Sequence, residues 1–243
     1  MDELLALLER YSPGYREGIQ GVDDWCIEDL EDLIGRPLPG CYKAFVKVMG
    51  QHAGPLLFDV TQHDLPHVMF LYRLNPRLPR RFLLLFGDPS PLAPTPYWLD
   101  LDSPSENGDC QVVRMPFGES EGTWKERLSK DYISLREMLF LWAMEYVHLP
   151  NFPHQARYCR SKGRQPSSAE DMARLLEKMG FVRLPYPRYS MLFERAGDGS
   201  ATRLYCPPDD PFFEIRVGMH SADKLRHFKL LIEDNTDLED SMQ

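Results

Sequence analysis

The sequence predicts an α+β fold, because helical and strand-like patterns occupy separate stretches of the chain. Amphipathic helices are expected within residues 1–49, short strands within 55–115, and another helix over about 134–148. A regular alternation of strands and helices would instead favour a parallel α/β sheet. The 243 residues, 43% of them hydrophobic, suffice for one large domain or for a main domain with a smaller one.

The first two helices are predicted from apolar residues at helical spacing. In residues 1–10 the buried face consists of Leu4, Leu7 and Leu8. In residues 25–34 it consists of Ile27, Leu30 and Ile34. We expect Asp24 to cap the second helix, since an aspartate side chain accepts hydrogen bonds from first-turn amides.

A rigid turn is predicted to join the second helix to a third. Gly35 suits the left-handed conformation that often ends a helix. Pro37 interrupts the helical pattern, and Pro39 suits the first turn of the next helix, residues 39–49. The buried stripe of that helix is Tyr42, Phe45, Val46 and Met49.

Short strands are expected after Gly54. The two earliest are residues 55–60 and 68–72, and the continuous apolar run 82–86 suits a central strand. Residues 97–101 and 110–115 flank a segment containing Asn-Gly, which predicts a hairpin. Ser134 and Glu137 then form a capping box that opens the helix ending near residue 148.

Residues 1–150 are thus predicted to form the main domain, and residues 151–166 a linker without periodicity. Residues 167–243 are predicted to be a smaller α-β-β-β-α unit with an acidic tail. Its first helix is opened by a capping box at Ser167 and Glu170 and stopped by Gly180. Its strands are expected at about 189–195, 201–206 and 212–217, and its last helix at 221–232.

No set of residues predicts catalysis or a metal site. The five cysteines are scattered, which is typical of small buried side chains. His63 and His67 have the HxxxH spacing, but Pro66 disfavours a helix there. Asp100 and Asp102 share one side of a strand, where paired carboxylates serve acid–base chemistry or simply end a strand. We favour the second interpretation and expect no enzymatic activity and no cofactor.

Charge is distributed unevenly along the chain, whose formal net charge is −9. Residues 23–32 and 233–243 contain only acids among their charged residues, so the remainder is slightly basic. Such acidity argues against nucleic-acid binding and fits a basic partner. The candidate partner-binding residues are Asp23, Asp24, Glu28, Asp29 and Asp32. A solvated helix face would also explain them.

The segment EDLIGRPLP, followed by YKAF, resembles the amino-terminal signature of the SUKH superfamily. The matching positions are Glu31, Ile34, Gly35, Leu38, Pro39, Tyr42 and Phe45. Weaker similarity continues through RFLLLFGD, YWLDLD and SLREMLFLW, to about residue 148. One departure is Met49-Gly50-Gln51, where the family usually has Asn-Gly-Gly or a similar sequence.

The resemblance implies a mostly antiparallel sheet flanked by helices, in a domain that binds proteins. Many bacterial members of the family look like immunity proteins that neutralise a secreted toxin, often a nuclease. We therefore expect a cytoplasmic immunity protein that occludes a basic toxin; the alternative is a non-catalytic regulatory or scaffold module. The absence of a signal peptide and of a long apolar run favours the cytoplasm and no membrane partner. The sequence does not specify an oligomeric state.

Overall fold

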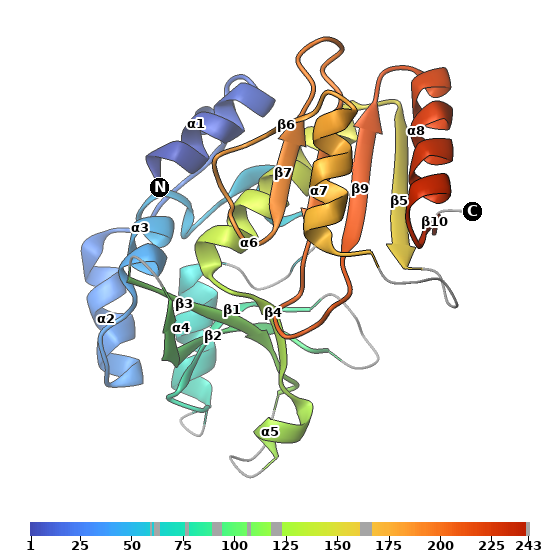
Figure 1. The fold of residues 1–243 in the computed structure, drawn as a ribbon. Helices are drawn as coiled ribbons and strands as arrows, with labels where there is room; N and C mark the ends of the chain where they lie inside the picture. Colours follow the sequence, from blue (N-terminus) through green and yellow to red (C-terminus); the bar gives the residue numbers. More distant parts are fainter. Residues whose placement is uncertain are drawn as a thin grey trace. The chain divides into compact units, whose positions relative to one another are not determined.

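The computed structural model describes residues 1–58, 60, 64–75, 78–88, 94–105, 108–117, 123–160 and 167–241. Two compact units make up the chain, Met1–Leu139 and Phe140–Gln243 (Figure 1). Both units combine helices with an antiparallel sheet, so the predicted α+β class is confirmed. No described helix combines the length and the apolar character needed to cross a membrane.

The three amino-terminal helices form where the sequence predicts them. They are α1 (Asp2–Tyr11), α2 (Asp24–Ile34) and α3 (Gly40–Met49), and a short 3-10 turn, Tyr15–Gly18, follows α1. Their predicted apolar stripes are all buried. The predicted cap is wrong by one residue: Asp23 occupies the N-cap position of α2, and its side chain makes no capping hydrogen bond.

The next segment differs from the prediction of two strands. Gly54–Leu57 is a 3-10 turn, and α4 spans Leu65–Leu74. The Asp64 side chain caps α4 by accepting a hydrogen bond from the His67 amide at 2.8 Å. Pro66 is tolerated because it lies in the first turn, where no intrahelical partner for its missing N–H exists. A short apolar run does not by itself distinguish a strand from a helix.

The sheet of the first unit has four antiparallel strands in the order β1-β2-β3-β4. They are β1 (Phe82–Phe86), β2 (Tyr97–Ser105), β3 (Asp109–Arg114) and β4 (Ser129–Tyr132), with the short helix α5 (Trp124–Arg127) before β4. The predicted hairpin is confirmed by the pairing of β2 with β3. β1 lies at an edge rather than in the centre, although all its residues are buried.

Helices α3 and α4 both contact the edge strand β1. The rings of Phe45 on α3 and Phe86 on β1 meet edge to face, 6.1 Å apart. The Tyr72 hydroxyl of α4 donates to the Phe82 carbonyl at 2.8 Å and accepts from the Leu84 amide at 3.1 Å. These contacts explain why a strand without a second strand neighbour is completely apolar.

The predicted helix near residues 134–148 is confirmed, with a change of winding along its length. Ser134 Oγ accepts a hydrogen bond from the Glu137 amide at 3.1 Å, as a capping residue does. Helix α6 (Leu135–Trp142) continues as a π-helix, Ala143–His148, and as a 3-10 turn, Leu149–Asn151. The boundary between the two units falls within α6.

The second unit contains a six-stranded antiparallel sheet in the order β10-β5-β9-β8-β7-β6. The strands are β5 (His154–Arg160), β6 (Val182–Arg183), β7 (Met191–Glu194), β8 (Ala201–Tyr205), β9 (Glu214–Met219) and β10 (Leu238–Asp240). Strands β7, β8 and β9 match the prediction.

Two predictions for this unit need correction. Residues 154–160 of the expected linker form β5, which pairs with β9 on one side and with β10 on the other. The expected acidic tail contains β10. Residues 151–153 of the predicted linker precede β5 and are described, whereas residues 161–166 lie outside the described residues. The polar residues of β5 concealed its alternation, because the buried Ala156 and Tyr158 are flanked by His154 and Arg160 on one face and opposed by Gln155 and Arg157 on the other.

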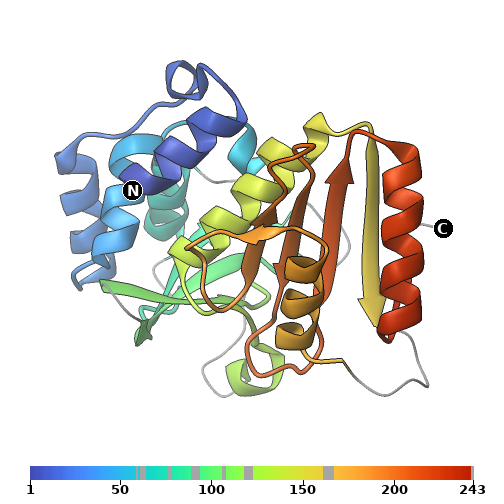
Figure 2. The same ribbon diagram turned by 45° about the horizontal axis from the view of Figure 1, so that its top comes forward.

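Helices α7 (Ala169–Lys178) and α8 (Ala222–Asn235) cover one face of this sheet (Figures 1 and 2). Met172 and Leu176 of α7 and Phe228 and Ile232 of α8 belong to the same core as strand residues such as Val217. The cap of α7 is Ser168, which accepts from the Asp171 amide at 3.0 Å, so the capping residue lies one position after the predicted one.

Candidate protein-binding surface

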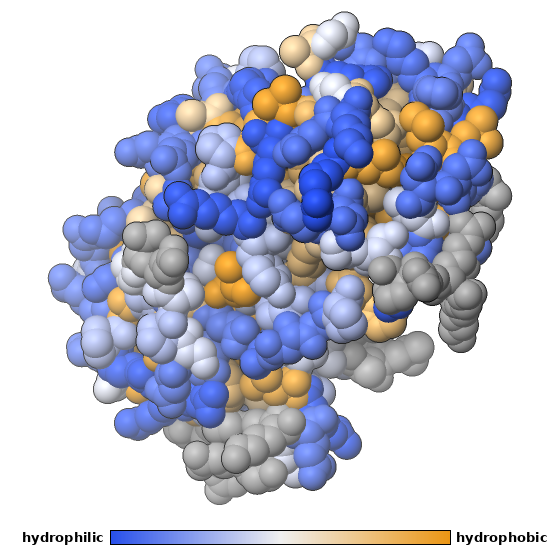
Figure 3. Space-filling view, in the orientation of Figure 1, coloured by the Kyte–Doolittle hydropathy of each residue, from blue (hydrophilic) through white to orange (hydrophobic). Residues whose placement is uncertain are grey.

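Helix α2 presents a polar stripe opposite its buried face. Burial of Cys26, Ile27, Leu30 and Ile34 leaves Trp25, Glu28 and Asp32 exposed at intervals of three or four residues. The Trp25 side chain is unusual there, because 63% of its surface is exposed. The surface around α2 is mostly hydrophilic (Figure 3).

The five predicted partner-binding acids all lie on α2 or at its N-cap. Three of them already form a contact within the chain. Asp24 pairs with Lys47 at 2.7 Å, and Asp29 pairs with Arg73. Asp23 accepts a hydrogen bond from the Trp25 indole at 3.3 Å.

Glu28 and Asp32 have neither an ion pair nor a hydrogen bond among the described residues. Their carboxylates lie at i and i+4 on the helix, where like charges repel by a few tenths of a kcal/mol. Both side chains are therefore available to a cationic partner. We call Trp25, Glu28, Asp29 and Asp32 the acidic stripe.

Glu31, the sixth acid of this segment, is part of the scaffold. Its carboxylate accepts from the Leu38 amide at 2.7 Å and from Lys43 Nζ at 3.1 Å. These two contacts, the backbone hydrogen bond first, lower the pKa of Glu31 despite partial desolvation. The side chain thereby fixes the turn between α2 and α3. The motif that carries the SUKH resemblance thus builds the support for the acidic stripe.

Helix α4 lies beside α2 and exposes apolar side chains that the sequence analysis missed. Phe70 is 52% exposed and Leu74 is 60% exposed. They lie at i and i+4, so they share one face of the helix. The missed signal is the composition of residues 65–74, in which apolar residues occur on the exposed side of the helix as well as on the buried side.

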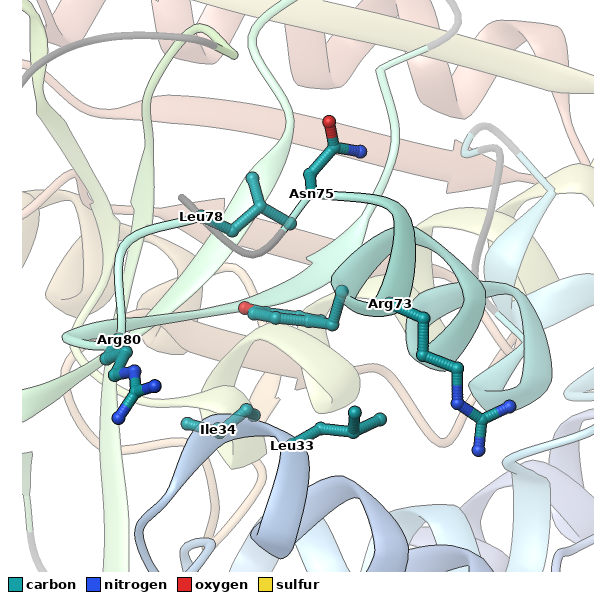
Figure 4. Close-up of a pocket in the computed structure, with 7 residues that line it drawn as sticks. Leu33, Ile34, Arg73, Asn75, Leu78 and Arg80 are labelled. Carbon is teal, nitrogen blue, oxygen red and sulfur yellow. The ribbon is translucent and has the colours of Figure 1, made fainter.

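A pocket of about 280 Å³ lies between the carboxyl-terminal parts of α2 and α4 (Figure 4). Its lining residues are Leu33, Ile34, Tyr72, Arg73, Asn75, Leu78 and Arg80. Arg73 and Arg80 lie on opposite sides of it, and Leu33 and Ile34 form the side that α2 contributes. Burial raises the pKa of Tyr72, whose hydroxyl is already bonded to β1. The pocket therefore has apolar walls between two guanidinium groups, of which that of Arg73 is paired with Asp29.

Asp100 and Asp102 are held in ion pairs in the structure. The carboxylate of Asp100 is buried and receives two hydrogen bonds from Arg81, at 2.8 and 2.7 Å. Desolvation raises the pKa of Asp100, but the hydrogen bonds from Arg81 and Ser103 outweigh it and lower the pKa below its usual range. Asp102 pairs with Arg36 at 2.9 Å. These contacts tie the α2–α3 turn and the start of β1 to β2.

The cysteines and the described histidines do not gather into a metal-binding group. Cys26, Cys110 and Cys206 are buried, as predicted, whereas Cys41 and Cys159 are half-buried; all five are free thiols. His63 lies outside the described residues. Within the part of the chain that the structure describes, no three His, Cys, Asp or Glu side chains are arranged to hold a metal ion.

Comparison with models of known protein families and with curated proteins found no match for this chain. The SUKH resemblance therefore remains a prediction that rests on the residue pattern around positions 31–45.

Proposed function

We propose that this protein is a non-catalytic, immunity-type inhibitor whose acidic stripe binds a basic protein toxin. The observation that carries the proposal is a pair of carboxylates, Glu28 and Asp32, that have no ion pair among the described residues and lie beside an exposed tryptophan on one helix face. Tryptophan is enriched among the residues that dominate binding energy, and acids around it select a cationic partner.

A nuclease is the class of toxin that this charge fits best. Nucleases that hold phosphate groups need Lys- and Arg-rich surfaces, which are also the surfaces that an acidic inhibitor attracts. Complementary charge mainly accelerates association, by up to several orders of magnitude at low salt. Inhibition by occlusion needs no chemistry from the inhibitor itself, in line with the ion-paired state of Asp100 and Asp102.

The proposal is tested by toxicity and rescue. Proteins from the encoding organism are captured on the full-length chain, and each captured protein is expressed alone and with the chain. We expect one captured protein to arrest growth alone and to be neutralised by co-expression. The variant Glu28→Lys/Asp32→Lys should slow association by about tenfold or more and abolish the rescue.

A matched control changes the same charge elsewhere. Glu177 on α7 and Asp234 on α8 are exposed and have no ion pair among the described residues. The variant Glu177→Lys/Asp234→Lys should therefore retain the rescue. If both variants lost the rescue equally, the net charge of the protein and not the position of Glu28 and Asp32 would explain the loss. A harmless partner, bound with the same stoichiometry, would favour a scaffold or regulatory module instead.

A further inference from the structure

Helix α4 carries an apolar face that the proposed acidic stripe does not include. Phe70 and Leu74 expose half or more of their side chains. Single exposed apolar residues are common on protein surfaces, but adjacent ones beside a hollow mark interaction sites. Phe70 lies one helical turn before Arg73, which lines the pocket between α2 and α4.

The apolar face, the pocket and the acidic stripe belong to one continuous surface. Arg73 of α4 pairs with Asp29 of α2, which joins the two helices along their length. Leu33 of α2, one turn beyond Asp29, lines the same pocket as Arg73. The side of α2 that carries Asp29 and Leu33 therefore adjoins α4 and the pocket.

We infer that the binding surface extends from the acidic stripe onto α4, and that the partner is a protein segment with apolar side chains flanked by lysine or arginine. This inference rests on the proposed function and specifies its contacts. An apolar side chain of the partner enters the pocket or packs on Phe70 and Leu74, while neighbouring bases face Glu28 and Asp32. Interfaces with an apolar centre and a charged rim have this arrangement.

The negative charge of Glu28 and Asp32 distinguishes among the molecules that could cover the surface of α2 and α4. A second copy of this chain would bring the same carboxylates of Glu28 and Asp32 against each other, in a protein of net charge −9. An anionic membrane surface would be repelled for the same reason. A basic protein segment is attracted by the acids and buries the apolar side chains.

The test uses a defined probe with the full-length chain. The probe is a short helical peptide with leucine on one face and lysine on the other, titrated while backbone amide NMR shifts are followed. Two control peptides replace every lysine by glutamate or every leucine by serine. We expect only the leucine–lysine peptide to bind, with shifts confined to α2 and α4.

Two variants separate the apolar contact from the charged one. Phe70→Ser/Leu74→Ser should weaken the probe's affinity by about tenfold or more and leave its salt dependence intact, as for loss of an apolar anchor. Glu28→Lys/Asp32→Lys should remove most of the salt dependence. Leu230→Ser, at a residue of α8 that is 54% exposed, is the matched control and should change nothing. The replaced side chains are exposed, and the NMR spectrum verifies the fold of each variant.

The outcomes distinguish this inference from the proposed function. If only the charge variant weakens binding, the inference about α4 fails and the acidic stripe stands. If only Phe70→Ser/Leu74→Ser weakens binding, the acidic stripe fails. Absence of binding at millimolar peptide, or equal binding of the glutamate peptide, overturns the inference.

Discussion

Gly35 is the residue on which the turn after α2 depends. Its φ of 77° lies in the left-handed region, and its amide donates to the Glu31 carbonyl at 2.7 Å. A Cβ at this position would lie 3.2 Å from Arg80 Nη1, the flexible end of a side chain. Steric crowding is therefore minor, and the conformational strain decides the cost of any other residue.

We predict that Gly35→Ala destabilises the protein by about 1–2 kcal/mol, the usual penalty of the left-handed conformation for an L-residue. Urea unfolding measures the difference. Gly18→Ala is the control, since Gly18 does not have a positive φ and a Cβ there meets nothing within 4 Å. Equal stability of the Gly35 variant and the wild type would mean that the turn does not require a glycine.

Asp198 makes stability dependent on pH. It lies between β7 and β8, where it accepts from Arg195 Nη2 at 2.5 Å and from Lys224 Nζ at 2.7 Å. Burial alone would raise the pKa of Asp198, but the hydrogen bonds from Arg195, Lys224 and Ser200 outweigh it and lower the pKa well below its usual range.

A lowered pKa in the folded state stabilises the fold at pH values above the unfolded pKa of about 4. The stabilisation is lost as pH falls from there towards the lower folded pKa. We therefore expect Asp198→Asn to be less stable than the wild type at neutral pH, and the difference to shrink below about pH 4. Thermal unfolding across this range measures it. A difference that does not change with pH would contradict this account.

At the scale of elements, the π-helix after α6 contributes a buried charge to the second sheet. Arg203 of β8 and Arg157 of β5 are both in register with Arg216 of β9. Glu145 of the π-helix pairs with Arg203 Nε at 2.8 Å and also with Arg216. The Glu145 and Arg203 side chains are only 5% and 7% exposed, so neither charge is solvated well.

We predict that Glu145→Gln costs about 1–3 kcal/mol, because the buried Nε of Arg203 loses its charged acceptor while Glu214 still pairs with Arg203 Nη2 at 2.6 Å. The control is Asp223→Asn, which breaks the exposed pair with Arg226 and should cost less than about 1 kcal/mol. Chemical denaturation compares the two variants. If both variants lost a similarly small free energy of unfolding, solvent would be shown to replace Glu145 as the partner of Arg203.

Elements with local signals were predictable from the sequence. The helices α1, α2 and α3 follow from apolar spacing, and the β2–β3 hairpin follows from its turn. Strand β5 was not predictable, because only Ala156 and Tyr158 are buried in a polar segment, and the ion-pair partner of Arg157, Glu214, is distant in sequence. Helix α4 was misassigned because only its Asp64 cap distinguishes it from a strand.

At the scale of the whole molecule, the two acidic segments of the sequence differ in how many of their carboxylates are ion-paired. In the carboxyl-terminal acidic segment, Asp237 is buried and pairs with Arg160 at 2.9 Å. Asp240 pairs with Lys229 at 3.4 Å. These acids stabilise the second unit. Glu28 and Asp32 on α2, by contrast, are exposed and have no such partners in the part of the chain that the structure describes.

The candidate site was therefore only partly predictable. A run of acids identifies α2 from the sequence, and its helical spacing places Glu28 and Asp32 on one face. The pocket and the contribution of Phe70 and Leu74 depend on how α4 lies beside α2. That contact joins segments about 40 residues apart and has no local signature.

The most direct test of the central claim is site-specific photocrosslinking in the encoding organism. A photoreactive amino acid replaces Glu28 on the acidic stripe or, as the control, Glu177 on α7. We predict one dominant adduct at position 28, formed with a protein that has a basic surface, and no such adduct at position 177. The same adducts at both positions, an acidic partner, or no adduct at position 28 would contradict the assignment of α2 as the binding surface.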